Sequence, residues 1–365
     1  MCCVDAVLGC LRRVLNIEER AGVVEGVVRP SGSLSLSIRD LLLGEITHDV
    51  SAEQPAISAL AARIREEMCL YPMTKHEAYR HVAGVDAGSQ ILPLASRRYG
   101  VISALAYALP RGCKFWIPPE AMSLPYGAAG NRFEGMVNAR REAKLYETAA
   151  LYLGAHPETE FMLVDGPLAF SDWWRIAGCH KDQKRLLNAV NHLLRLSRES
   201  GVTLAGVVKR PSARYLLYHL GLQGETQLPD NFLLLHTLRP GERTDIFSPK
   251  MALAQANRTA EFMGNLDMPV YSFYGRMTRE WSIPPIRIDL PAHSLGALDD
   301  VADYCYGSAL GNGIPLPIVK ADEEVKITRR FMAEVYGEVL SRVSRRTGEV
   351  RSLAPYWGEG KGMGA

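Results

Sequence analysis

Three apolar segments of this chain each end in a side chain that can take part in chemistry. Helix-like stretches separate the segments, and alternation of strand and helix predicts an α/β sheet. Sites in such sheets lie beyond the carboxyl ends of strands, so we expect the three side chains to meet in one crevice. The segments are Val82–Val85 followed by Asp86, Phe161–Val164 followed by Asp165, and Leu204–Val208 followed by Lys209.

The spacing of apolar residues predicts further elements along the chain. We expect extended structure around a turn over Val23–Ile46, and two strands, His81–Asp86 and Tyr99–Leu109, joined by a turn at Gly88-Ser89. The other expected helices are Ala52–Cys69, Phe133–Leu153, Asp182–Ser200 and a long final helix over Ala321–Arg345. The other expected strands are Cys113–Pro118, Met268–Tyr274 and Ile286–Leu290.

Composition restricts the class of protein. The 365 residues are 47% hydrophobic and 22% charged, as in folded chains with a core. The 42 basic and 40 acidic residues nearly cancel, so a nucleic-acid site has to be a local patch. Seven scattered cysteines without a C-x-x-C pair argue against a disulfide scaffold and favour a reducing cytoplasm. No window approaches about 18 uninterrupted apolar residues, so we expect no membrane span and no membrane partner.

Carboxylates that converge need a positive charge between them. Two of them about 4 Å apart repel by about 4 kcal/mol at an effective dielectric constant of about 20. A divalent cation removes this cost, and Mg²⁺ or Mn²⁺ uses a few carboxylates while leaving positions for water and a phosphate. Phosphodiester hydrolysis by metal-activated water is the chemistry that follows. Lys209 would offset charge on the phosphate or orient the water.

Each motif taken alone also fits an ordinary structural role. Asp-Gly after an apolar run is a hairpin signal, and a lone lysine at a strand end is most often solvated. For Asp165 the hairpin is disfavoured by Pro167, which has no N–H to donate to a returning central strand.

A third acidic ligand is expected from the helix over Phe133–Leu153, which carries Glu142 and Glu147. Five residues advance a helix by about 140° beyond one full turn, so the two carboxylates cannot share a face. Only one of them can point at the metal. We favour Glu147, which lies nearer the strand ending in Asp165, and keep Glu142 as the alternative. Either could be a solvated glutamate.

Basic and aromatic residues beyond Asp165 are candidates for binding DNA. Lysines and arginines could neutralise backbone phosphates, and tryptophans could stack on bases. A solvated helix face for the charges and core packing for the tryptophans are the equally weighted alternatives. The candidates are Trp173, Trp174, Arg175, Lys181, Lys184 and Arg185, followed by Arg210 and Arg214.

Together these motifs resemble the NurA nuclease family of archaea, whose domain has an RNase H-like fold. The matching stretches span His81 to Thr328: VAGVDAGS, REAKLYETAALYL, LVDGPL, GVVKRPSARYL, GERTDIFSP, RIDLP and GIPLPIVKADEEVKIT. We therefore expect an α/β, RNase H-like mixed central sheet flanked by helices. The expected parts are an N-terminal arm of helices and short strands for interaction or oligomerisation (residues 1–80), a nuclease domain ending in a long helix (81–345), and a mobile tail (346–365).

The resemblance also implies an activity and partners. The activity is that of a Mn²⁺-dependent deoxyribonuclease, with Mg²⁺ as an alternative, that cuts single strands internally and degrades DNA from 5′ to 3′ in DNA end resection for recombination repair. Family members are dimers that dock on the hexameric HerA ATPase. The expected partners are single-stranded DNA, duplex ends, HerA and a second copy of this chain. By position, Asp86 and Asp165 match the family's metal-binding aspartates, and Glu147 or Glu142 matches the glutamate between them.

One departure from the family pattern lies near the C-terminus. Where the family typically has Gly-Tyr-Pro followed by Ala-His, this chain has Gly313-Ile314-Pro315 and Ala321-Asp322. Asp322 can still be an oxygen ligand to Mn²⁺. Ile314 has no hydroxyl, so either a shifted donor such as Tyr304 or Tyr306 replaces the tyrosine or the activity is weakened. A catalytically weakened or inactive subunit that binds DNA and HerA is the second hypothesis.

Overall fold

The computed structural model describes residues 34–75, 79–94, 96–125, 132–170 and 180–354. The chain forms two compact units, Met1–Pro55 and Ala56–Ala365. In the first unit the described residues are helical, and their large apolar side chains are exposed. No helix in the described part of the chain is long and apolar enough to cross a membrane.

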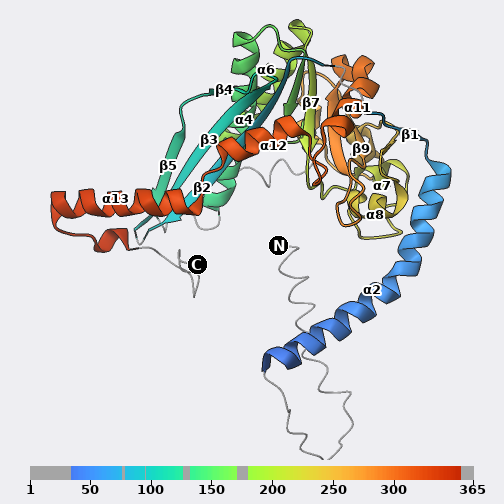
Figure 1. The fold of residues 1–365 in the computed structure, drawn as a ribbon, viewed down its shortest axis with the longest axis horizontal. Coiled ribbons are helices and arrows are strands. Elements are labelled where there is room, and N and C mark those ends of the chain that lie inside the picture. Colours follow the sequence, from blue (N-terminus) through green and yellow to red (C-terminus); the bar gives the residue numbers. More distant parts are fainter. Residues whose placement is uncertain (1–33, 76–78, 95, 126–131, 171–179, 355–365) are drawn as a thin grey trace, which may run out of the picture. The chain divides into compact units, whose positions relative to one another are not determined.

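The second unit is built on one ten-stranded mixed sheet (Figure 1). The strands are β1 (Leu70–Pro72), β2 (Val82–Pro93), β3 (Arg97–Leu109), β4 (Cys113–Trp116), β5 (Glu120–Pro125), β6 (Phe161–Val164), β7 (Thr203–Val208), β8 (Glu242–Thr244), β9 (Val270–Gly275) and β10 (Ile286–Pro291). Their order is β1-β8-β9-β10-β7-β6-β2-β3-β4, and β5 also pairs with β3. The central strands β2, β6 and β7 are parallel, and the other pairs are antiparallel.

Helices cover both faces of this sheet. The described α-helices are α2 (Leu34–Glu67), α4 (Arg132–Ala155), α6 (His180–Glu199), α7 (Tyr215–His219), α8 (Asp230–Thr237), α9 (Pro249–Gln255), α10 (Glu261–Gly264), α11 (Leu298–Ser308), α12 (Leu316–Val325) and α13 (Arg329–Thr347). Two 3₁₀ turns are η2 (Ala292–Ala297) and η3 (Arg351–Leu353). Side chains of α4 and α6 share a core with one face of the central strands, and α11 and α12 pack on the other face (Figure 1).

The apolar run of β6 follows from its position between two layers of helices. Met162 and Val164 belong to the core on the α4 side, whereas Phe161 and Leu163 belong to the core on the α12 side. A strand buried on both faces has no polar alternation, which is why its sequence is continuously apolar. The expected α/β class with a mixed sheet and flanking helices is confirmed.

Two expected elements near the N-terminal side differ from the structure. The extended structure expected over Val23–Ile46 is wrong from Leu34 onward, where α2 has begun, and the preceding residues lie outside the described part. Leucine, arginine and glutamate in this segment favour helix, and they outweigh the local turn signals. The turn expected at Gly88-Ser89 is also wrong, because β2 continues through both residues in its ladder with β3. The chain turns instead after Leu94, whose N–H donates to the carbonyl of Arg97.

The long final helix expected over Ala321–Arg345 is two helices. Helix α12 ends at Val325, and α13 begins at Arg329. The hydroxyl of Thr328 accepts a hydrogen bond from the N–H of Phe331 at 3.1 Å, which caps the second helix. The apolar spacing continues across the break, so periodicity alone missed the cap.

A close approach of backbones seats α12 on the sheet. A Cβ atom added to Gly84 of β2 would lie 2.2 Å from the carbonyl oxygen of Pro317 in α12. Only glycine therefore permits this contact, because carbon and oxygen atoms of unbonded groups cannot approach so closely.

We predict that Gly84→Ala lowers the free energy of unfolding by about 1–3 kcal/mol or more, because α12 has to move away from β2. Gly154→Ala is the matched control, since nothing lies within 4 Å of a Cβ at that helical position. The control should be neutral or stabilising by up to about 1 kcal/mol. Urea unfolding followed by circular dichroism measures both, and equal stabilities would contradict the proposed packing constraint.

Candidate metal centre

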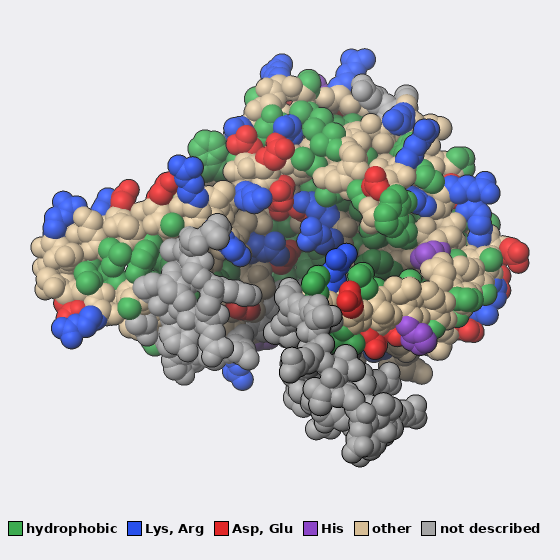
Figure 2. Space-filling view, turned by 60° about the horizontal axis from the view of Figure 1, so that its bottom comes forward, with side chains coloured by type: hydrophobic (Ala, Val, Ile, Leu, Met, Phe, Trp, Pro, Cys, Tyr) green, Lys and Arg blue, Asp and Glu red, His purple; other side chains and the backbone are tan. Residues whose placement is uncertain are grey.

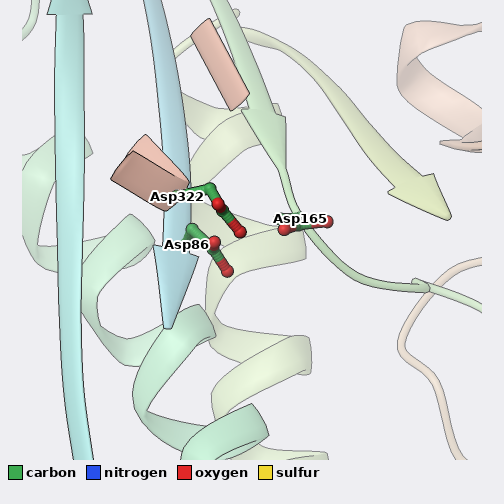
Figure 3. A group of neighbouring side chains, drawn as sticks. All are labelled: Asp86, Asp165 and Asp322. Carbon is green, nitrogen blue, oxygen red and sulfur yellow. The ribbon is translucent and has the colours of Figure 1, made fainter. Parts of the chain in front are cut away.

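Three aspartates from distant parts of the chain meet at one edge of the sheet (Figure 3). Asp86 lies on β2, Asp165 directly follows β6, and Asp322 lies on α12. One carboxylate oxygen from each lies within 4.8 Å of the other two. The convergence expected for Asp86 and Asp165 is present, and Asp322 joins them.

Backbone pairing explains why these side chains meet. Val85 and Val164 are partners in the parallel ladder, and the N–H of Asp165 donates to the carbonyl of Val85 at 2.8 Å. Asp86, which lies within β2, and Asp165, which directly follows β6, are therefore side by side at the same level of the sheet. Helix α12 brings Asp322 to them because Gly88 leaves room for the carbonyl of Val325, which would lie 2.8 Å from a Cβ at that position.

The environment of the aspartates opposes their negative charges. Asp86 is only 5% exposed, and burial, followed by the charge of Asp165, raises the pKa of Asp86 to about 8. Burial also raises the pKa of Asp165, although Lys209 acts in the opposite direction. Burial alone would lower the pKa of Lys209, but the charges of Asp165 and Asp86 outweigh it and raise this pKa. Such mutual effects require the groups to be close together.

Lys209 supplies part of the missing positive charge. Its Nζ lies 2.5 Å from Oδ2 of Asp165 and 3.4 Å from Oδ1 of Asp322. One ammonium group balances one carboxylate, so three ionised aspartates leave two negative charges uncompensated. Hard oxygen donors with excess negative charge are the donor set that Mg²⁺ and Mn²⁺ prefer. The residues present therefore fit a divalent cation.

Of the two candidate glutamates, Glu142 lies beside this site. A Cβ at Gly166 would lie 3.4 Å from Oε2 of Glu142, and that oxygen is buried without a hydrogen-bond partner in the described structure. Burial raises the pKa of Glu142, and Asp165 adds to this effect although Arg141 opposes it. A buried, unsatisfied carboxylate oxygen is costly unless a cation or donor occupies its surroundings.

Glu147 faces a different neighbour. Its two carboxylate oxygens each accept a hydrogen bond of 2.7 Å from Arg185 of α6, and Arg185 also binds Glu120. Hydrogen bonds from Arg185 lower the pKa of Glu120 to about 2. As the helical spacing requires, the two glutamates of α4 do not share a face. The preference for Glu147 does not match this geometry, which favours Glu142.

The basic residues expected to bind DNA fall into different environments. Lys181, Lys184 and Arg210 are exposed. Arg185 forms ion pairs with Glu120 and Glu147. Arg214 donates a hydrogen bond of 2.7 Å to the carbonyl of Gln223 and so stabilises the loop that contains it. Trp173, Trp174 and Arg175 lie outside the described residues.

Sequence reasoning missed Tyr146, which lies one helical turn after Glu142 and is fully buried. Its hydroxyl donates to the carbonyl of Pro167 and so supports the turn that carries Asp165. The signal was its spacing of four residues from Glu142, which puts both side chains on one face of α4.

The shifted tyrosine donors do not lie at this edge. The ring of Tyr304 is 5.5 Å from that of Phe161, the first residue of β6. Four residues of strand span about 13 Å, which separates that position from Asp165. Tyr306 instead packs under Gly241. Ile314 is half-buried against the apolar core on the α12 side.

Fold and site together define an α/β protein with a candidate cation site at the edge of its parallel strands. The family model of the NurA domain matches residues 80–327. The chain therefore belongs to the NurA family, as its motifs indicated.

Solved structures agree with this assignment at the level of fold. The crystal structure of the NurA nuclease from Sulfolobus solfataricus is similar with a TM-score of 0.60 and 14% identity, over 90% of this chain and 100% of that one. A crystal structure of NurA with manganese gives a TM-score of 0.53 and 11% identity, over 81% of this chain and 98% of that one. The RNase H-like fold is confirmed. No curated protein gives a significant match to the sequence.

We predict that the two glutamates of α4 differ in their effect on metal binding. Glu142→Gln should weaken Mn²⁺ affinity by about 10- to 100-fold, whereas Glu147→Gln should change it by no more than about twofold. The reason is that only Glu142 lies beside the aspartates. Isothermal titration calorimetry measures both affinities, and the reverse order would assign the ligand to Glu147.

Proposed function

We propose that this chain is a divalent-metal-dependent DNA nuclease, with Mn²⁺ as its cation. The observation that carries this proposal is the convergence of Asp86, Asp165 and Asp322 within 4.8 Å of one another. Membership of the NurA family, and a fold shared with NurA nuclease structures, support a nuclease. We assign Asp86, Asp165, Asp322 and Glu142 as the groups that hold the cation.

The proposed chemistry divides between the cation and the protein. When bound, the cation would polarise the phosphodiester and stabilise the charge that develops on it. Asp86 lies within the paired strand β2 and Asp165 directly follows β6, so both carboxylates are held in place and would fix the cation against the sheet. Lys209 lies between Asp165 and Asp322, from where its ammonium group can bind a non-bridging phosphate oxygen. Tyr146 keeps the turn after Asp165 in place through Pro167.

We further propose the finer properties of this nuclease. They are endonuclease activity on single strands, 5′-to-3′ exonuclease activity on DNA ends, a role in end resection for repair, a homodimer, and docking on a HerA-type hexameric ATPase. We assign the nuclease domain to residues 81–345. Support for these properties comes from the family alone, and co-purification with the ATPase and light scattering would test the partners.

The second candidate function is a NurA-like subunit with weakened or no catalysis that binds DNA and the ATPase. Two observations favour it: Ile314 offers no hydroxyl where the family typically has tyrosine, and Lys209 occupies part of the cation's surroundings. Such a subunit would bind DNA and the ATPase but leave DNA intact with every divalent metal.

We predict that Asp165→Asn lowers Mn²⁺-dependent cleavage of single-stranded DNA by more than about 100-fold while the protein remains folded. The change removes a charge that holds the cation but keeps the size of the side chain. Cleavage of an end-labelled oligonucleotide with Mn²⁺, Mg²⁺ or chelator measures the effect, and thermal melting checks the fold.

Asp267→Asn is the matched control, because Asp267 forms a surface ion pair with Arg195 at 2.7 Å and lies in another part of the molecule. This variant should cleave like the wild type. Full activity of Asp165→Asn would remove the metal assignment. Hydrolysis of p-nitrophenyl phosphate without DNA cleavage would indicate a phosphatase instead.

A further inference from the structure

A cavity of about 630 Å³ is lined by residues that lie close in the chain to Asp165 and Lys209. Pro167, two residues after Asp165, lines it, and so do Val208 and Arg210 on either side of Lys209. The ends of β6 and β7 therefore contribute both to the metal centre and to this cavity. Its volume lies within the range of pockets that bind molecules of nucleotide size.

The charge of the cavity favours an anion. Four arginines line it, and none of the described residues that line it is acidic. Two of these arginines already bind groups of the protein itself. Arg287 forms a buried pair with Asp289 at 2.8 Å, and Arg214 braces the loop at Gln223.

The other two arginines, Arg210 and Arg258, are exposed. Neither guanidinium group forms an ion pair or hydrogen bond with any residue that the structure describes. Arg258 lies 5.4 Å from the centre of the Tyr218 ring. Figure 2 shows Lys and Arg side chains gathered beside a hollow near the middle of the face that it presents.

The backbone that carries Arg258 is fixed by the end of helix α9. Asn257 adopts a left-handed conformation with φ of 52°, and the N–H of Arg258 donates to the carbonyl of Leu253 at 2.8 Å. This is the hydrogen-bond pattern of a Schellman motif, in which asparagine is tolerated in place of glycine. The motif orders both residues at the rim of the cavity, where Asn257 adds an amide group.

Part of the lining of the cavity is apolar. Phe170 and Leu253 line the cavity and are nearly buried, with 4% and 3% exposed. A cavity lined both by apolar side chains and by a few charged groups can hold a base and its phosphate together.

We propose that this cavity, called here the arginine pocket, binds a nucleotide of a single DNA strand next to the bond cut at the metal centre. The phosphate lies between Arg210 and Arg258, and the base lies against Phe170 and Leu253. This assignment rests on the proposed nuclease function, because it makes the pocket a subsite for the same strand. The bound phosphate belongs either to a strand terminus or to an internal phosphodiester.

The test is binding of a fluorescent single-stranded oligonucleotide in chelator, where no cleavage occurs, at several salt concentrations. The double variant Arg210→Gln/Arg258→Gln should bind more weakly, and its slope of log affinity against log salt should fall by about 0.7, the value for one lost phosphate contact on a single strand. Arg198→Gln is the control, because Arg198 is an exposed arginine on the last turn of α6, next to the start of β7 at the opposite edge of the sheet. Unchanged affinity and slope in the folded double variant would overturn the proposal.

Oligonucleotides with a 5′-phosphate, a 3′-phosphate or no terminal phosphate distinguish the two sources. A gain in affinity from a terminal phosphate that the double variant loses assigns the pocket to that terminus. A reduced slope that is the same for all three oligonucleotides assigns it to an internal phosphodiester. Binding is measured without cleavage, so the pocket and the nuclease function are tested separately. If the double variant loses binding but the wild type never cuts DNA, the nuclease function is rejected and the pocket is retained.

Discussion

Parallel pairing of β2, β6 and β7 is the constraint on which the site depends. The ladder sets Val85 opposite Val164, so the residues that follow them, Asp86 within β2 and Asp165 after β6, lie side by side. Strand β7 pairs with β6 in the same direction and ends just before Lys209. Since both faces of these strands are buried, the strands cannot shift in register without exposing their apolar side chains. The relative positions of two carboxylates and one ammonium group are therefore fixed by the core rather than by surface loops.

The electrostatic interactions among the aspartates oppose the stability of the fold. Burial, followed by the charge of Asp165, raises the pKa of Asp86 to about 8, and burial also raises the pKa of Asp165. One lysine compensates only part of the charge. Proteins retain such costs where function needs them, because the repulsion is relieved when a cation binds. Residues that follow β6 and end β7 also line the arginine pocket, which is consistent with the proposed site for a metal and a DNA strand.

Helices that are remote in sequence complete the site from both faces of the sheet. Helix α12 approaches β2 through Gly84 and delivers Asp322 from one side, and α4 delivers Glu142 and Tyr146 from the other. The buried pair of Arg287 and Asp289 ties the turn after Asp165 to β10, because Asp289 accepts hydrogen bonds from the N–H groups of Leu168 and Ala169. Each contact is long-range in sequence, so the site exists only in the folded chain.

The sequence by itself determined the α/β class, the central strands, the helices α4 and α6 and the convergence of Asp86 with Asp165, because apolar periodicity is a local signal. It also carried the family motifs. Only the tertiary structure shows that Glu142, and not Glu147, lies beside the aspartates, since helical geometry separates their faces without saying which face meets the sheet. Neighbours brought close by folding also decide three other features: the continuation of β2 beyond Gly88, the break before α13 and the arginine pocket. Side-chain partners such as that of Arg185 are set by packing in three dimensions, and no local pattern encodes them.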